Sequence, residues 1–224
     1  MKYSKTLSQE YSDNREKYTA TDTRVFEIVE KILVQGDDVL DLGCGDGRYS
    51  FSLMGKGAGS VIGLDVSEEM INLARKRNEV ASNSKVTFVL GDAEDLPYSS
   101  PLFNGCFSNF VLHYFKNLDE VFIGIANTLK TNGWLIATMN IAEITDVSIG
   151  NEIMPILLGD TVEVETLIKT DQDVFSALES ANLKLVLYEE LNNEYLKIKP
   201  SYIHKDKISK FKNIVVVAKK VAPF

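Results

Sequence analysis

Short apolar runs alternate with amphipathic stretches along most of this chain. The apolar runs predict buried strands at residues 39–42, 60–65, 85–90, 103–112, 133–140, 183–189 and 214–219. Apolar residues spaced three and four apart predict helices over residues 21–34, 48–54, 67–80, 117–130 and 171–181. Successive strand–helix units joined by short loops predict right-handed crossovers and a parallel sheet.

This alternation stops after Asn140. Residues 141–170 show no clean period and predict an irregular insert with a short helix and extended pieces. No helix fits between the last two predicted strands, so these strands could pair antiparallel, although their link is long for a hairpin. The link, within residues 191–212, is rich in lysine and is either a surface for an acidic substrate or partner, or a solvated loop.

Composition and charge predict one soluble domain spanning 1–224. The net charge of −8 makes nucleic acid a poor candidate partner, because binding a phosphate backbone usually requires a basic face. Cys44 and Cys106 show neither metal-ligand spacing nor a disulfide framework. The polar start of the chain and the lack of long apolar runs predict a cytoplasmic protein with no membrane partner.

The segment 1–20 carries scattered tyrosines. Tyr11 and Tyr18 would share one helical face. The segment is therefore either a lid that closes over a site or a partly ordered tail that docks its aromatic rings.

A glycine-rich turn follows the first predicted strand. Gly43, Gly45 and Gly47 let the backbone approach a ligand, and the helix after them offers free N–H groups. The pattern is G-x-G-x-G rather than the dinucleotide fingerprint G-x-G-x-x-G. Asp41, two residues before the first glycine, would repel a pyrophosphate and suits a ligand with an ammonium group.

Two further acids stand where predicted strands end, at the edge of the sheet where ligands bind in open α/β folds. Asp65 could accept two hydrogen bonds from a ribose diol, or simply place a charge at a helix start. Asp92 could accept a hydrogen bond from an adenine amino group, helped by the Ala93 N–H, or cap a short helix. Val66 and Met70 could pack on the adenine, although Met70 could equally be core.

Ordered strings of sequence between residues 39 and 139 resemble a known enzyme family. They are VLDLGCGDG, VIGLDVSEEMINLARKR, FVLGDAEDLP, FSNFVLHYF and LKTNGWLIATM. Together they resemble the core of class I S-adenosylmethionine-dependent methyltransferases of the small-molecule type. The resemblance implies an α/β fold: a Rossmann-like, doubly wound, seven-stranded sheet. That sheet would be mostly parallel, with an antiparallel last strand and the order 3-2-1-4-5-7-6.

The same resemblance implies roles for individual residues. Gly43, Gly45 and the intervening Cys44 would contact the methionine part of S-adenosylmethionine, and Asp41 would hold its ammonium through water. The remaining cofactor-binding residues would be Asp65, Val66, Met70, Asp92, Ala93, Asn109 and Phe110, the last two near the donated methyl. The product would be S-adenosylhomocysteine.

His113 is the best candidate for a general base, if the acceptor needs one, and otherwise packs in the core. Tyr114, Tyr11 and Tyr18 are weaker catalytic candidates. No Asn-Pro-Pro-Tyr string, acidic metal cluster or suitably placed cysteine nucleophile follows the fourth strand, so a small-molecule acceptor is expected and no metal. Residues 1–20, 141–170 and 191–212 are the expected substrate-side elaborations.

Two other functions are also compatible with the sequence. One is a regulatory protein that binds S-adenosylmethionine without turnover. The other is a nicotinamide oxidoreductase, which the short glycine spacing and Asp41 disfavour. The sequence is compatible with a monomer or a homodimer.

Overall fold

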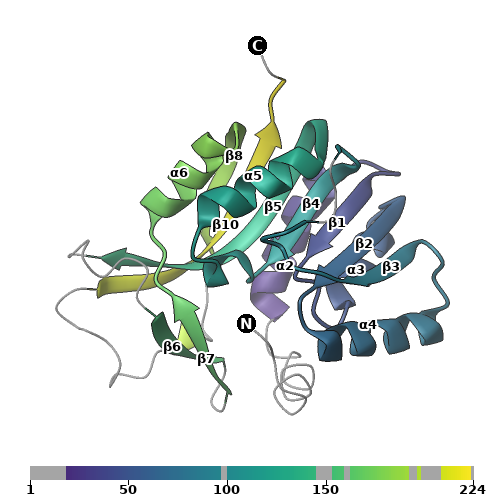
Figure 1. The fold of residues 1–224 in the computed structure, drawn as a ribbon, viewed down its shortest axis with the longest axis horizontal. Helices are drawn as coiled ribbons and strands as arrows, with labels where there is room; N and C mark the ends of the chain where they lie inside the picture. The colour runs from purple at the N-terminus through teal and green to yellow at the C-terminus, as the bar shows by residue number, and fades with distance from the viewer. Residues whose placement is uncertain are drawn as a thin grey trace.

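The computed structural model describes residues 19–96, 100–144, 153–158, 162–191, 196–197 and 208–222 of the 224-residue chain. A seven-stranded sheet runs through it in the order β3-β2-β1-β4-β5-β10-β8 (Figure 1). Its strands are β1 (Asp38–Leu42), β2 (Ser60–Asp65), β3 (Val86–Leu90), β4 (Phe103–Asn109), β5 (Leu129–Ile144), β8 (Leu183–Leu191) and β10 (Ile208–Lys220).

The first five strands pair in parallel, and β10 is antiparallel to both of its neighbours. Numbered by their order in the chain, the seven strands therefore have the order 3-2-1-4-5-7-6. The predicted fold class is confirmed, including the reversed last strand.

Helices cover both faces of the sheet. They are α2 (Thr19–Ile32), α3 (Arg48–Gly55), α4 (Glu68–Ala81), α5 (Leu118–Thr128) and α6 (Asp171–Ser180). Apolar side chains of α2 and α3 share one core with Trp134 and Ile136, whereas those of α5 and α6 pack on the other face with Leu135 and Ala137. These four β5 residues alternate between the two cores, as the two-residue period of a strand requires. The sheet is thus buried on both sides, as expected for a parallel sheet.

Side-chain caps fix several helix starts. Ser67 accepts a hydrogen bond from the Met70 N–H at 3.3 Å, and Asn117 accepts one from the Glu120 N–H at 3.3 Å. Thr170 and Asp173 form a reciprocal capping box at the start of α6. These caps fix the residue at which each of the three helices begins.

Several predicted boundaries differ from the structure. The fourth strand ends at Asn109, and the 3-10 helix η2 (Leu112–Tyr114) replaces the rest of the predicted run. The α5 helix ends at Thr128, so Leu129 and Lys130 belong to β5, and this strand continues to Ile144. The last strand likewise begins at Ile208.

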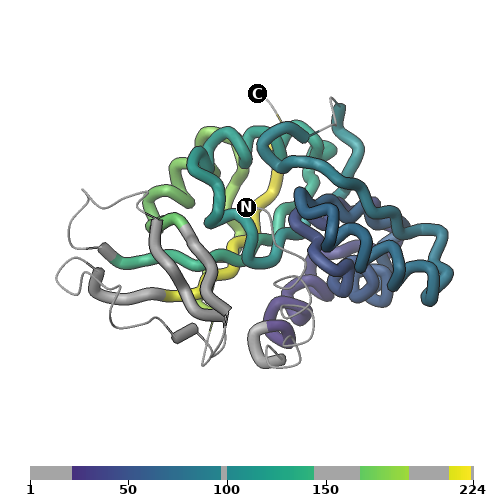
Figure 2. Tube along the Cα trace, turned by 60° about the horizontal axis from the view of Figure 1, so that its bottom comes forward, coloured from purple at the N-terminus to yellow at the C-terminus, as the bar shows by residue number. Residues whose placement is uncertain are grey.

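The long strands β5 and β10 run side by side beyond the end of β4 (Figures 1 and 2). The described part of the insert is extended rather than helical: β6 (Ile153–Leu158) and β7 (Val162–Leu167) form a second, antiparallel sheet with β9 (Leu196–Lys197). This small sheet thus brings together the predicted elaborations 141–170 and 191–212. No helix in the described ranges is long and apolar enough to cross a membrane.

Candidate functional site

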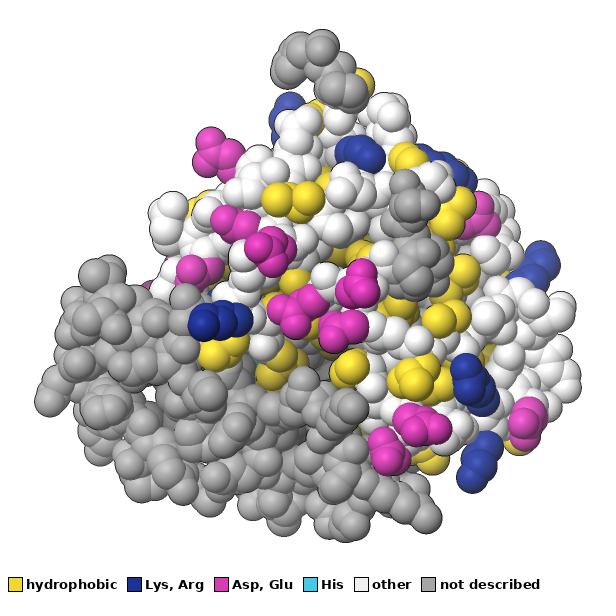
Figure 3. All heavy atoms as spheres, viewed as in Figure 1, with side chains coloured by type: hydrophobic (Ala, Val, Ile, Leu, Met, Phe, Trp, Pro, Cys, Tyr) yellow, Lys and Arg dark blue, Asp and Glu magenta, His cyan; other side chains and the backbone are white. Residues whose placement is uncertain are grey.

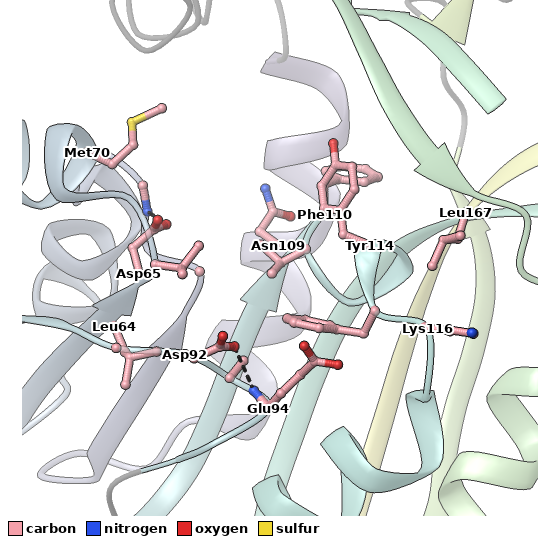
Figure 4. Close-up of a pocket in the computed structure, with 17 residues that line it drawn as sticks. Leu64, Asp65, Met70, Asp92, Glu94, Asn109, Phe110, Tyr114, Lys116 and Leu167 are labelled. Atoms are coloured by element: carbon pink, nitrogen blue, oxygen red, sulfur yellow. Dashed lines mark hydrogen bonds between the residues drawn. The ribbon is translucent and has the colours of Figure 1, made fainter. Parts of the chain in front are cut away.

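A cavity of about 280 Å³ opens at the carboxyl edge of the main sheet (Figure 4). It is lined by Gly43, Gly45, Leu64, Asp65, Val66, Met70, Gly91, Asp92, Ala93, Glu94, Asn109, Phe110, Val111, Tyr114, Phe115, Lys116 and Leu167. These residues come from the ends of β1 to β4 and the loops after them, from the start of α4, from η2 and the loop after it, and from β7. This is the edge at which ligands bind in open α/β sheets.

The glycine-rich turn borders the cavity with bare backbone. Gly43 and Gly45 have φ angles of 73° and 54°, a region that most other residues avoid. A Cβ at Gly43 would lie 2.3 Å from a methyl carbon of Val111, so the turn also fits closely against the segment after β4. The N–H groups of Gly43 and Cys44 both donate to the Leu64 carbonyl, at 2.7 and 3.0 Å.

Asp65 is held by two backbone donors. Its Oδ2 accepts a hydrogen bond from the Gly45 N–H at 2.9 Å, and its Oδ1 accepts one from the Ser67 N–H at 2.9 Å. The carboxylate that lines the cavity is therefore oriented before any ligand binds.

Asp92 follows the neighbouring strand. Its Oδ1 accepts a hydrogen bond from the Glu94 N–H at 3.0 Å, and its carboxylate is exposed at the cavity beside the buried Ala93. Glu94 also lines the cavity, although the sequence reasoning did not select it. Acidic side chains gather near the centre of this face of the molecule (Figure 3). Such a surface suits a ligand that carries positive charge or hydrogen-bond donors.

The end of β4 is strained and firmly held. Phe110 has a φ of 56°, which is uncommon for a residue other than glycine. Its N–H donates to the Thr138 hydroxyl oxygen at 2.9 Å, and this hydroxyl donates to Asn109 Oδ1 at 2.7 Å. Strain of this kind is typical of functional sites. Asn109 and Phe110 both line the cavity, and their predicted contact with the cofactor stays a prediction.

Asp41 and Cys44 are placed differently. Asp41 is 1% exposed, accepts a hydrogen bond from the Ser50 hydroxyl at 2.6 Å, and is not among the described residues that line the cavity. Cys44 is also buried, and this burial, followed by the charge of Asp41, raises the pKa of its thiol. Their predicted contacts with the methionine part of the cofactor stay predictions.

His113 lies behind the cavity wall rather than in it. The side chain is 0% exposed, and its ring nitrogens face Asn140, with Nε2 at 3.3 Å from Nδ2 and Nδ1 at 3.5 Å from the backbone nitrogen. Burial, and then the charge of Lys169, lower its pKa to about 3, so the imidazole is neutral at pH 7. A base must reach the proton that it removes, and the placement of His113 therefore does not favour this role.

Tyr114, by contrast, lines the cavity. Its ring lies 4.3 Å from that of His113, measured between centroids. One 3-10 turn thus turns His113 inward and Tyr114 toward the site. Tyr11 and Tyr18 lie outside the described residues.

Several lining residues were not predicted from the sequence. Phe115 and Lys116 come from the loop before α5, and Leu167 comes from the end of β7. Only the general expectation that residues 141–170 form a substrate wall pointed toward Leu167. In the described ranges, no group of three or more His, Cys, Asp or Glu side chains could hold a metal ion.

Comparison with known proteins places this geometry in a family. The methyltransferase domain family matches residues 33–188. Malonyl-[acyl-carrier protein] O-methyltransferase of Legionella pneumophila is 30% identical over 117 residues, which cover 52% of this chain and 40% of the relative. Juvenile hormone acid O-methyltransferase of Bombyx mori is 36% identical over 103 residues, covering 44% of this chain and 36% of the relative.

Both relatives are thus matched over less than half of their own length. A solved structure of the [4+2]-cyclase SpnF superposes with a TM-score of 0.71 at 19% identity, covering 90% of this chain and 82% of that one. At this identity the likeness shows the fold alone. The family match spans more than half of the chain, and the chain belongs to the S-adenosylmethionine-dependent methyltransferase domain family.

Proposed function

We propose that this protein transfers a methyl group from S-adenosylmethionine to a small-molecule acceptor. The observation that carries the proposal is the oriented carboxylate of Asp65, which shares one cavity with Asp92 and with the bare backbone of Gly43 and Gly45. Asp65 would bind the ribose diol of the donor, and Asp92 would bind the adenine amino group. The backbone of Gly43 and Gly45 would contact the methionine part.

The residues present fit the donor. Asp65 presents an oriented carboxylate for the ribose hydroxyls, and Asp92 is exposed beside Ala93 for adenine. Val66 and Met70 supply apolar surface. S-adenosylmethionine supplies a sulfonium methyl that is already electrophilic. The chain's main contribution is therefore to position the acceptor in line with this methyl, which can supply roughly 7–11 kcal/mol of the barrier.

We also propose that the acceptor atom is a carboxyl oxygen. Both relatives described above are named as O-methyltransferases, and one is named for an acid. A carboxylate is ionised at pH 7 and needs no general base, which agrees with a His113 that is neutral and buried. Leu167 supports the view that residues 141–170 form part of the acceptor wall.

Isothermal titration tests donor binding. We expect a measurable heat of binding with S-adenosylmethionine and with S-adenosylhomocysteine. The absence of binding heat with both ligands would refute the proposal. A second test incubates the protein with the donor and a panel of carboxylic acids, and seeks products heavier by one methylene unit. Products formed only from amines or thiols would overturn the carboxyl assignment and leave donor binding intact.

A second candidate function is donor binding without methyl transfer. The burial of His113 favours this alternative, because it takes the best candidate base out of the cavity. It predicts normal titration with S-adenosylhomocysteine and no methylated product from any class of acceptor. A single methylated product formed at a catalytic rate would exclude it.

A further inference from the structure

The cavity has two halves with different chemistry (Figure 4). Asp65 and Asp92 lie on one side, and Tyr114, Leu167 and Lys116 lie on the other, with Asn109 between them. The first half holds all the groups that suit the nucleoside of the donor. The second half is built mainly from aromatic and aliphatic side chains plus one cation, and the carboxylate of Glu94 lies between the two halves.

Lys116 is the cation of the second half. It lies in the loop between η2 and the start of α5, and its side chain is exposed. In the described part of the chain, its ammonium makes no ion pair. Other lysines there do pair, as Lys56 does with Glu30 and Lys130 with Asp38. Because no acid among the described residues pairs with it, this cavity-lining cation is available for an anionic ligand.

A second lysine holds this loop in place from behind. Lys169 is 2% exposed, and its Nζ donates to the Lys116 carbonyl at 3.0 Å. Its own carbonyl accepts a hydrogen bond from the Ala142 N–H at 2.7 Å. Leu167 lies two residues before Lys169 in the sequence. Lys169 therefore connects the wall that contains Leu167 to the loop that contains Lys116, although the two are distant in the sequence. It also adds a buried positive charge behind Lys116.

We propose that this half of the cavity binds an amphipathic carboxylate, with Lys116 binding the anionic group and Lys169 acting as a positioning residue for Lys116. The apolar part of the ligand would pack against Phe110, Tyr114 and Leu167. The inference rests on the proposed methyl transfer and names its acceptor class. In the reaction, a lone pair of one carboxylate oxygen forms the new O–C bond, the C–S bond breaks, and its electron pair stays on sulfur. No proton moves.

The test measures binding of octanoate and its neutral analogue octanamide in the presence of saturating S-adenosylhomocysteine. Wild-type protein should bind octanoate more tightly than octanamide. Lys116→Met should weaken octanoate binding about tenfold, as expected for losing a hydrogen bond to a charged group, and should leave octanamide binding unchanged. Lys76→Met is the matched control, because Lys76 is exposed on α4 away from the cavity.

Lys169→Met tests the positioning role. It should weaken octanoate binding as Lys116→Met does, and the double variant should be no weaker than Lys116→Met alone, because one lysine acts through the other. Additive losses would overturn that role.

The acceptor class is overturned if wild-type protein binds both ligands equally, binds neither, or if Lys116→Met binds octanoate normally. Failure of S-adenosylhomocysteine itself to bind would instead refute the proposed function. The comparison of wild type with Lys116→Met decides the acceptor class even if Lys169→Met does not fold.

Discussion

At the scale of single residues, Asp65 carries the strongest prediction. Asp65→Asn keeps the size of the side chain, but its amide nitrogen cannot accept a hydrogen bond from either backbone N–H that now binds the carboxylate. We expect the dissociation constant for S-adenosylhomocysteine to rise about 10- to 100-fold, measured by isothermal titration.

Asp38→Asn is the control for this experiment. Asp38 begins β1 at the opposite edge of the sheet, where it binds the Ser60 hydroxyl and Lys130. Its substitution should leave the affinity unchanged. Equal affinities of Asp65→Asn and wild type would contradict the assignment of this carboxylate to the ribose.

His113 predicts a specific dependence of stability on pH. Its pKa is lowered from 6.5 to about 3 in the folded chain, so the unfolded chain binds the extra proton first as the pH falls. Above about pH 6.5, the neutral ring makes its full contribution to the free energy of unfolding. Below this pH the contribution falls, and about 2 kcal/mol of it is lost at pH 5.

Denaturant unfolding of wild type and His113→Gln at pH 8 and pH 5 measures this effect. Wild type should be about 2 kcal/mol less stable relative to His113→Gln at pH 5 than at pH 8, because only wild type carries a side chain that takes up a proton on unfolding at pH 5. A difference independent of pH would show that the ring is not held neutral.

Residue types and their positions predicted one part of the site better than the other. Asp65, Asp92 and the glycines could be placed because strand ends meet at one edge of a parallel sheet. The sequence left two positions open for His113, in the cleft or in the core, because a single 3-10 turn decides which of two adjacent rings faces the core. Lys116 and Leu167 were missed because long-range packing brings them together.

At the scale of elements, close packing between strands explains one glycine in β4. A Cβ at Gly105 would lie 2.1 Å from the indole ring of Trp134, whose Nε1 donates to Asp37 at 2.9 Å. Gly105→Ala should therefore lower the unfolding free energy by about 1–3 kcal/mol, since this core cannot admit a methyl group without rearranging.

The same substitution on a helix should have the opposite sign. Gly124 lies within α5, and a Cβ there would meet nothing closer than 3.7 Å. Gly124→Ala should raise the unfolding free energy by about 0.5–1 kcal/mol, because alanine loses less backbone entropy on folding. Urea denaturation measures the unfolding free energy of both variants relative to wild type. Destabilisation of equal size in both would argue against the close contact with Trp134.

Local pattern predicted the elements of the central domain and their order, but not how far the strands extend. The period of α5 continues through Leu129, yet the chain leaves the helix at Thr128 to begin β5. Pairing with β10 then carries β5 to Ile144, well past the end of β4. The partner that stabilises this extension is some 70 residues away in the sequence, so no local window contains the signal.

At the scale of the whole molecule, one ligand should stabilise the entire fold, because its cavity is formed by segments from β1 to β7. Binding to the folded chain alone adds about 2.7 kcal/mol at a ligand concentration 100 times the dissociation constant. For a chain of this length, that corresponds to a rise in Tm of about 5–10 °C.

Thermal unfolding monitored by intrinsic fluorescence can separate the donor half of the cavity from the acceptor half. S-adenosylhomocysteine should raise the Tm of wild type and of Lys116→Met equally, because Lys116 lies in the other half, and should raise that of Asp65→Asn much less. NADH at the same concentration should leave the Tm unchanged, since the glycine spacing differs from the dinucleotide fingerprint and the acids that line the cavity would repel a pyrophosphate. A shift with NADH as large as that with S-adenosylhomocysteine would mean that the strand-end acids do not select against a nucleoside that carries a pyrophosphate.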